Sequence, residues 1–205
     1  MNRLLLGTQN EGKIKEIREL MADMSAIELL TFADVVFSDV EETGSTFLEN
    51  ALLKATQICE ETGLPVLAED AGLQVDALGG APGVRSARFS GEPVDTERNN
   101  ALLLERLTGV DGRSARFITV AALCLPDQQI FVCTGVLRGH INRCPVGEGG
   151  FGYDPLFIPD GETRTLAQMS LDDKNRISHR RRAIGRMRAI LVDLMATGEL
   201  DQRSR

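Results

Sequence analysis

The sequence lacks several features that would point to common functional classes. Its 205 residues contain no tryptophan, one tyrosine and two histidines, and aromatic residues make up only 4%. The net charge of −7 gives no electrostatic support for general nucleic-acid binding. No apolar run approaches the roughly 20 residues that span a bilayer, and the start of the chain is too short for the apolar core of a signal peptide. We therefore expect a cytoplasmic protein without a membrane or nucleic-acid partner.

The four cysteines do not suggest a zinc site or a disulfide framework. Cys59, Cys124, Cys133 and Cys144 form no Cys-x-x-Cys pair and have no neighbouring histidine ligands. Scattered cysteines of this kind are typical of reduced and mostly buried thiols in a cytoplasmic protein.

The pattern of apolar residues and breakers predicts an α/β fold with a mixed sheet, with residues 1–205 as a single domain. Strands are expected at 3–6, 27–32, 65–68, 115–125 and 130–141, the last two as an antiparallel hairpin, with a weaker extended segment at 35–40. Helices are expected after Asn10, with a buried stripe reaching Met24, and at 46–61, 95–107 and 180–195. A polar, frayed tail is expected from about residue 198.

The predicted central strand is followed at once by two acids. Pro65–Ala68 is a short apolar run, and Glu69 and Asp70 come next, before Gly72 lets the backbone turn. Carboxylates at the end of a core strand need to be solvated, paired or bound to a cation. Ligands of α/β proteins bind at such strand ends, although an isolated Glu-Asp pair is more often a solvated turn.

A polar loop between the first strand and the first helix is a candidate phosphate site. It consists of Thr8, Gln9, Asn10, Glu11, Gly12 and Lys13. Backbone N–H groups and the helix dipole favour anions at a helix start, and phosphate above all. The loop does not have the Walker pattern, so an ordinary strand–helix turn is the alternative interpretation. Local groups of this kind can hold a small anionic substrate even in an acidic chain.

Acidic residues on separate segments form a candidate metal site. Glu41 precedes the helix at 46–61, and Asp70 follows the central strand. Two carboxylates suit Mg²⁺, which also takes waters and substrate phosphates as ligands. Spacing alone leaves open that the acids are simply solvated. Lys54 lies close to the apolar face of the same helix, where a snorkelling stem is the commoner explanation.

Aromatic residues on a glycine-rich frame form a candidate base-binding segment. Phe151 and the only tyrosine, Tyr153, lie among glycines rather than on a periodic apolar face. This arrangement suits stacking on a planar ligand, although Phe151 could equally close one end of the sheet. Lys174, His179 and Arg180 precede or begin the last helix. A lone histidine in that place is more often a capping or solvated residue than a catalyst.

These segments form an ordered series of motifs over residues 3 to about 195. They are Thr8-x-Asn10-x-x-Lys13, Glu41-Glu42-Thr43-Gly44, Glu49-Asn50-Ala51-x-x-Lys54-Ala55, Ala68-Glu69-Asp70-x-Gly72-Leu73, Gly149-Gly150-Phe151-Gly152-Tyr153-Asp154-Pro155 and Ser178-His179-Arg180. The series resembles the inosine/xanthosine triphosphate pyrophosphatases, most closely the bacterial dITP/XTP group. Two positions depart from the commonest pattern of that family. Gln9 stands where glycine is frequent, and Ala71 stands where serine is frequent, so a substrate contact at Ala71 must come from the backbone.

The resemblance implies an elongated, long mixed β-sheet with flanking helices that form two lobes around a central cleft, and it implies a homodimer. The implied metal is Mg²⁺, bound by Glu41 and Asp70, with Asp70 also the catalytic residue that orients or deprotonates the attacking water. The implied substrate-binding residues are Thr8, Gln9, Asn10, Glu11, Gly12, Lys13, Lys54, Ala71, Phe151, Gly152, Tyr153, Asp154, Lys174, His179 and Arg180. Among them, Thr8, Asn10, Lys13 and Lys174 would hold phosphate, Phe151 would stack on the purine, and Asp154, His179 and Arg180 would read its edge. The implied reaction converts ITP, dITP and XTP to the monophosphate and pyrophosphate.

Two other functions are compatible with much of this pattern. A Maf-type pyrophosphatase acting on pyrimidine or modified nucleotides would give the same products, so only a substrate panel separates it from the first function. A nucleotide-binding regulator without turnover would be expected to lack an acid at Glu41 or Asp70, and both acids are present.

Overall fold

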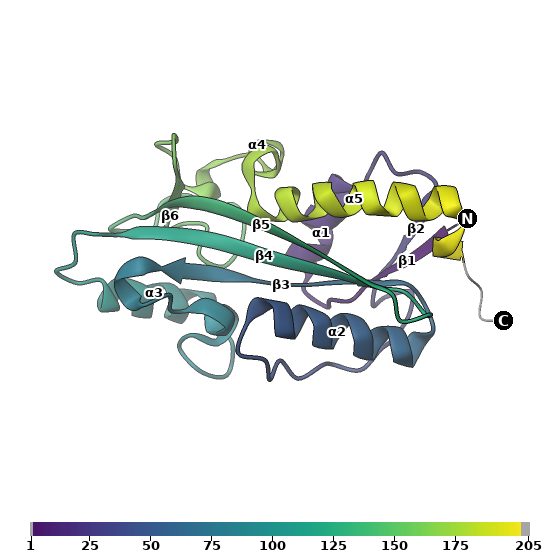
Figure 1. The fold of residues 1–205 in the computed structure, drawn as a ribbon. Helices are drawn as coiled ribbons and strands as arrows, with labels where there is room; N and C mark the ends of the chain where they lie inside the picture. Colours follow the sequence, from purple (N-terminus) through teal and green to yellow (C-terminus); the bar gives the residue numbers. More distant parts are fainter. Residues whose placement is uncertain (1, 202–205) are drawn as a thin grey trace. The chain divides into compact units, whose positions relative to one another are not determined.

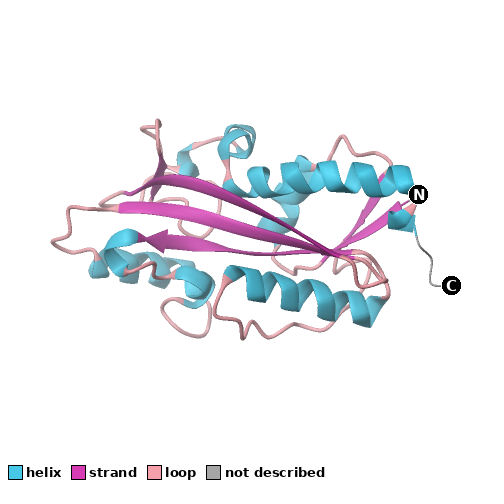
Figure 2. Ribbon diagram, in the orientation of Figure 1, coloured by secondary structure: helices cyan, strands magenta, loops and turns pink. Residues whose placement is uncertain are grey.

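The computed structural model describes residues 2–201, and their architecture is α/β (Figure 1). The strands are β1 (Asn2–Leu6), β2 (Ile27–Leu30), β3 (Val66–Val75), β4 (Ser114–Cys124), β5 (Ile130–Ile141) and β6 (Phe157–Pro159). The helices are α1 (Glu11–Leu20), α2 (Phe47–Thr62), α3 (Thr96–Arg106), α4 (Leu171–Ile177) and α5 (His179–Thr197). Short 3₁₀ segments lie in the connections, and Figure 2 shows how loops link the helices and strands.

The strands form one mixed sheet, which confirms the predicted fold class. Their order is β2-β1-β3-β4-β5-β6. β1 pairs in parallel with β2 and with β3, where Leu5 lies opposite Val66, while β5 and β6 pair antiparallel. β4 and β5 are neighbours joined by a tight turn, in which the Gln128 N–H donates to the Leu125 carbonyl over 2.8 Å. This short connection is that of the predicted hairpin.

The chain divides into two compact units. Unit 1 consists of Met1–Asp70, Thr119–Gly135 and Arg180–Arg205, and unit 2 consists of Ala71–Ile118 and Val136–His179. The long strands β3, β4 and β5 therefore contribute residues to both units, and the boundary on β3 falls directly after Asp70.

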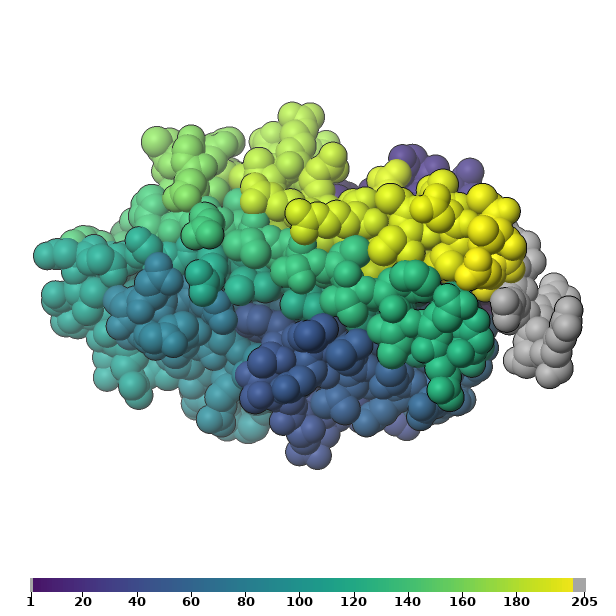
Figure 3. All heavy atoms as spheres, in the orientation of Figure 1, coloured from purple at the N-terminus to yellow at the C-terminus, as the bar shows by residue number. Residues whose placement is uncertain are grey.

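In unit 1, helices cover both faces of the sheet (Figure 1). Leu6 of β1 shares a buried cluster with Ile17 of α1 and Met187 of α5. On the other face, α2 packs so closely that a Cβ on Gly7 would lie 3.2 Å from Cδ1 of Ile58. Each large side chain buried in this way contributes about 1.5–3 kcal/mol. The outer side of α5 lies at the surface (Figure 3), where Val192 is exposed.

In unit 2, an aromatic cluster supports the core. The rings of Phe117 and Phe157 lie 4.8 Å apart between centroids, and Leu73, Leu103 and Tyr153 belong to the same buried cluster. Tilted aromatic pairs at this separation stabilise a core beyond the area that they bury.

Local capping signals place two helices where the sequence predicts them. Thr46 and Glu49 form a capping box at the start of α2: the Glu49 N–H donates to Thr46 Oγ1, and the Thr46 N–H donates to Glu49 Oε2, both over 3.1 Å. α2 ends at Gly63, whose φ of 64° is left-handed. The Asp95 side chain accepts from the Arg98 N–H over 2.9 Å and begins α3.

The central strand is longer than predicted. β3 continues to Val75 instead of stopping at Ala68, so Glu69 and Asp70 lie inside the strand and Gly72 does not turn the chain. The prediction that the two acids end a strand is therefore wrong. The apolar pattern resumes at Leu73 and Val75, which are both 0% exposed, and burial of this second stretch keeps the backbone extended.

Other differences concern the weaker signals. α1 ends at Leu20 rather than near Met24, although Met24 stays buried. Residues 35–40 contain no strand, while β6 and α4 were not predicted. Residues 199–201 form a 3₁₀ turn that buries Leu200, so the predicted frayed tail does not begin at 198, and residues 202–205 lie outside the described part.

Two further expectations concern the cysteines and the membrane. Cys59, Cys124 and Cys133 are buried thiols, as expected, while Cys144 is exposed. Among the residues described, no helix combines the length and the apolar character needed to cross a membrane.

Candidate active site

Side chains of the polar loop after β1 accept hydrogen bonds from the backbone of the same loop. The Gly7 N–H donates to the Leu67 carbonyl over 2.9 Å, and this bond fixes the loop to β3. Thr8 Oγ1 accepts from the Asn10 N–H over 3.2 Å, and Asn10 Oδ1 accepts from the Lys13 N–H over 3.1 Å. Asn10 is therefore the N-cap of α1, as predicted, and the loop presents a helix start, which favours anions.

The ammonium of Lys13 belongs to a buried network of charges in unit 1. Its Nζ lies 3.6 Å from Glu69 Oε1. Arg180 donates to the same carboxylate through Nε at 2.9 Å and through Nη2 at 2.7 Å. A further hydrogen bond joins Arg180 Nη1 to Glu16 of α1. The Arg180 and Glu69 side chains are each only 1% exposed, so Arg180 ties the start of α5 to α1 and β3.

Burial and charge shift the pKa values in this network in opposite ways. Burial opposes ionisation of Glu69, but Arg180 and Lys13 outweigh it and lower the pKa of that carboxyl. Burial lowers the pKa of Lys13, only partly offset by Glu69. Burial also opposes the charge on Arg180, but Glu69 and Glu16 raise its pKa overall. The sequence did not predict that Glu16 and Glu69 pair with Arg180, because no local motif signals a salt bridge between residues so far apart in the chain.

Asp70 is held by two residues of α2. Its Oδ2 accepts from Asn50 Nδ2 over 3.1 Å, and its Oδ1 lies 3.5 Å from Lys54 Nζ. Asn50 and Lys54 are four residues apart, so they lie on one face of the helix. The Asp70 side chain is 6% exposed. Burial is the main cause that raises its pKa, with Glu42 adding to it, while Lys54 and Asn50 act in the opposite direction.

The acid that the structure brings into this cluster is Glu42 rather than Glu41. Lys54 Nζ lies 2.6 Å from Glu42 Oε1 as well as 3.5 Å from Asp70, while Glu41 is exposed. The Gly44 N–H donates to Asn50 Oδ1 over 2.7 Å, which anchors the segment that carries both acids. Glu41 and Glu42 are adjacent in the sequence, and only the folded course of this segment shows which of them faces Lys54.

In unit 2, the predicted base-binding residues form a second cluster. Lys174 Nζ lies 2.5 Å from Asp154 Oδ2 and 4.7 Å from the centroid of the Phe151 ring. The same oxygen of Asp154 accepts from the Phe151 N–H over 2.9 Å. Lys174 and Asp154 are buried, whereas Phe151 is 36% exposed.

The glycine-rich segment around Phe151 is fixed on both sides. Tyr153 Oη donates to the Ser86 carbonyl over 2.9 Å, and Asn100 Nδ2 donates to the Gly152 carbonyl over 3.1 Å. Tyr153 is 4% exposed and packs in the core of unit 2, so it supports the loop instead of facing solvent. Gly152 has a φ of 62°, which favours glycine at that position. The support from Asn100 was not predicted, since its helix carries no motif.

His179 lies in unit 2 and stacks on Phe117. The two rings are 4.8 Å apart between centroids and inclined by 12°. His179 is 4% exposed, so this histidine is a buried residue at the start of α5 and not a solvated one. Stacking on an aromatic ring fixes the orientation of the imidazole.

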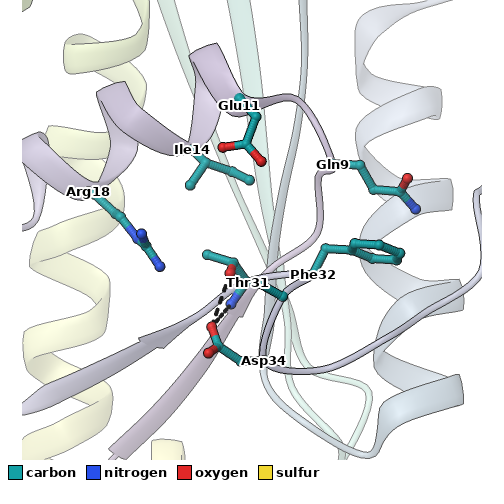
Figure 4. A pocket seen from close by; sticks show the side chains of 8 residues that line it. Gln9, Glu11, Ile14, Arg18, Thr31, Phe32 and Asp34 are labelled. Atoms are coloured by element: carbon teal, nitrogen blue, oxygen red, sulfur yellow. Dashed lines mark hydrogen bonds between the residues drawn. The ribbon is translucent and has the colours of Figure 1, made fainter.

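The remaining predicted residues, Gln9, Glu11, Gly12 and Ala71, do not form one cluster. Gln9 and Glu11 line a pocket of about 210 Å³ together with Arg18, Phe32 and Asp34 (Figure 4). In that pocket Asp34 Oδ2 accepts from both the N–H and the hydroxyl of Thr31. Gly12 lies in the first turn of α1, and Ala71 is half-buried in β3.

No three histidine, cysteine, aspartate or glutamate side chains group around a metal position within the described residues. Glu42 and Asp70, which converge on the ammonium of Lys54, are a donor set that fits a divalent cation. Mg²⁺ needs few protein carboxylates because it keeps waters and substrate phosphates as ligands.

Unit 1 thus combines an anion-favouring helix start, lysines and buried carboxylates, and unit 2 presents an aromatic ring on a fixed loop. A helix start that favours anions, on an α/β fold, is typical of proteins that handle phosphorylated ligands. The chain belongs to the Ham1 family, whose sequence model matches residues 4–190.

Individual relatives cover almost the whole chain. A protein of Streptomyces avermitilis called dITP/XTP pyrophosphatase is 48% identical over 199 residues, which are 95% of this chain and 100% of the relative. The solved structure of a HAM1 protein from Coxiella burnetii is 40% identical, with a TM-score of 0.86 over 94% of this chain and 100% of that one. A nucleoside-triphosphatase / dITP/XTP pyrophosphatase from Mycobacterium abscessus is 41% identical, with a TM-score of 0.74 over 92% and 98% of the two chains.

Proposed function

We propose that this protein hydrolyses ITP, dITP and XTP to the monophosphate and pyrophosphate, with Mg²⁺ as its cofactor, as a cytoplasmic homodimer. Family membership and the name of the Streptomyces avermitilis relative support this proposal. The observation that carries the chemistry is the convergence of Glu42 and Asp70 on one positive group, Lys54. Mg²⁺ is bound by one or two such carboxylates together with waters and substrate phosphates.

The loop after β1 is proposed to bind the triphosphate. The backbone N–H groups at the start of α1 favour phosphate oxygens, and Thr8 and Asn10 shape the loop. Lys13 supplies a positive charge at this helix start, and Glu69 restrains its ammonium. Positive charge in this place stabilises the negative charge that builds up on the leaving pyrophosphate.

Asp70 is proposed to be the catalytic base as well as a metal ligand. An ordinary aspartate is a weak base at neutral pH, but the raised pKa of Asp70 brings its basicity closer to the working pH. Asn50 holds Oδ2 of the carboxylate, and Oδ1, which lies 3.5 Å from Lys54 Nζ, is the oxygen proposed to meet a cation or an attacking water. We assign the partner acid to Glu42 and not to Glu41, because Glu42 faces Lys54 and Asp70. Mg²⁺, when bound, would acidify water and neutralise charge on phosphate oxygens.

The purine is proposed to stack on Phe151. The exposed ring is held by Asp154, Lys174 and the Asn100 contact to Gly152, so the stacking surface is preorganised. His179 is proposed to contact the edge of the base. Lys174 was predicted to hold phosphate, but its ion pair with Asp154 favours a part in shaping the base-binding loop.

Arg180 was predicted to read the edge of the purine. Its guanidinium is buried and donates to Glu69 and Glu16, so we assign it to hold Glu69 and Lys13 in position. Any effect of Arg180 on base selectivity would then be indirect: Arg180 follows His179 directly at the start of α5 and would act by positioning that histidine.

The family assignment does not favour the two alternative functions. A Maf-type enzyme would prefer pyrimidine or modified nucleotides, and a regulator would bind nucleotides without turnover. A nucleotide panel with Mg²⁺, assayed for pyrophosphate and orthophosphate separately, tests all three. We expect pyrophosphate from ITP, dITP and XTP. Preferred turnover of pyrimidine nucleotides, release of orthophosphate, or binding without products would each contradict the proposal.

A further inference from the structure

The ammonium of Lys54 occupies an unusual position between two acids from different segments. It lies 2.6 Å from Oε1 of Glu42 and 3.5 Å from Oδ1 of Asp70. The Lys54 side chain is only 11% exposed, so it is not a solvated surface lysine. A buried ammonium is retained where carboxylates neutralise it.

Asn50 anchors Asp70 and the segment that carries Glu42 independently of Lys54. Asn50 donates to the other oxygen of Asp70 over 3.1 Å, and it accepts from the Gly44 N–H over 2.7 Å. Asp70 is part of β3, which is buried on both sides along this stretch. Asp70 and the segment that carries Glu42 are therefore both anchored to Asn50 by contacts that do not involve the lysine.

The charges of this cluster do not balance. Two carboxylates and one ammonium leave an excess negative charge in a poorly solvated place. A divalent cation between the same two carboxylates would balance them. A lysine and a divalent cation cannot both lie between them without strong repulsion.

We propose that Lys54 is an internal counter-ion that a divalent metal replaces. In the nucleotide-free protein Lys54 partly neutralises Glu42 and Asp70, and it thereby weakens metal binding. When a metal bound to a nucleotide arrives, the lysine leaves the carboxylates and its ammonium becomes available to the phosphates. The inference rests on the proposed function, and it adds that metal and nucleotide bind together because Lys54 opposes the metal alone.

The test measures binding of Mn²⁺, used as a spectroscopic substitute for Mg²⁺, to the nucleotide-free full-length protein by electron paramagnetic resonance at pH 8. Lys54→Met keeps the length of the side chain and removes its charge. It should tighten Mn²⁺ binding on the order of tenfold or more, because it removes a positive charge within a few ångström of the metal. Lys54→Arg should bind Mn²⁺ about as weakly as the unmodified protein. Lys15→Met, on the exposed side of α1, is the matched control and should change nothing.

A second pair of variants separates this inference from the proposed metal site. Adding Asp70→Asn to Lys54→Met should abolish the tighter binding, because a ligand is lost. If Lys54→Met binds Mn²⁺ no more tightly than the unmodified protein while Asp70→Asn alone weakens binding, the metal site stands and the counter-ion role is refuted. If Asp70→Asn has no effect in either background, the proposed metal site and the counter-ion role both fail.

Discussion

Arg180 and Glu69 form a buried ion pair in which one guanidinium meets one carboxylate through two nitrogens, with Nε at 2.9 Å and Nη2 at 2.7 Å. The same guanidinium also donates to Glu16. One arginine at the start of α5 thus joins α1 to β3, and it does so directly beside Lys13.

This relationship predicts a large loss of stability when Arg180 is removed. Arg180→Met should lower the free energy of unfolding by about 3–5 kcal/mol, because it removes the guanidinium that binds two buried carboxylates, Glu69 and Glu16. Denaturant unfolding monitored by circular dichroism measures the loss. Lys15→Met, at an exposed position of α1, should stay within about 0.5 kcal/mol of the unmodified protein. A loss equally small at Arg180 would show that the network contributes little to the fold.

Asp70 should be essential for turnover and dispensable for folding. Asp70→Asn keeps the shape of the side chain and removes its charge, so kcat should fall by about 10²–10⁴-fold, as is typical when an acid–base group is lost. The comparison is Glu69→Gln, which should act through stability because Glu69 partners Arg180. Near-normal turnover of Asp70→Asn, with an inactive but fully folded Glu69→Gln, would assign catalysis to the other acid.

The raised pKa of Asp70 also predicts how its charge affects stability. A carboxyl whose pKa is higher in the folded than in the unfolded protein binds protons more tightly when the protein is folded. Ionisation of Asp70 therefore lowers the stability of the protein as the pH rises above 3.8, the ordinary pKa of the carboxyl. Asp70→Asn should therefore be at least as stable as the unmodified protein at pH 7, gaining about 1.4 kcal/mol for each unit by which the pKa is raised. The difference should vanish below pH 3.8. A destabilised Asp70→Asn at pH 7 would mean that the hydrogen bonds to Lys54 and Asn50 outweigh burial.

Lys13 should act on the triphosphate and not on the base. Lys13→Ala removes a charge at the start of α1 and should weaken binding of ITP much more than binding of inosine. Isothermal titration calorimetry with both ligands gives the comparison. An equal loss for the two ligands would show that Lys13 does not bind phosphate.

Local signals in the sequence were sufficient to predict much of the fold. Asn10, Thr46, Gly63 and Asp95 act within one helical turn, and the helix ends that they predicted are those observed. The length of β3 was not predicted, because it depends on burial of Leu73 by side chains far away in the chain.

The same difference between local and long-range signals decides which parts of the candidate site could be predicted. Its phosphate loop and glycine-rich segment have recognisable motifs, but the partners of its charged residues do not. Glu16 and Arg180 are 164 residues apart, and Lys54 meets Glu42 only because Asn50 anchors the intervening loop. The choice between neighbouring acids such as Glu41 and Glu42 depends on the course of the backbone, which composition and spacing do not specify.

The central claim is selective hydrolysis of purine triphosphates that carry a carbonyl at position 6. Adenine carries an amino group there, and a site built to donate hydrogen bonds leaves buried donors unpaired against it. Each unpaired group costs about 1–3 kcal/mol. The decisive measurement is kcat/KM for ITP, dITP, XTP, ATP and GTP under the same Mg²⁺ concentration, with pyrophosphate as the assayed product. The account predicts that ITP, dITP and XTP exceed ATP by several orders of magnitude and also exceed GTP. Comparable values for ITP and ATP would contradict it.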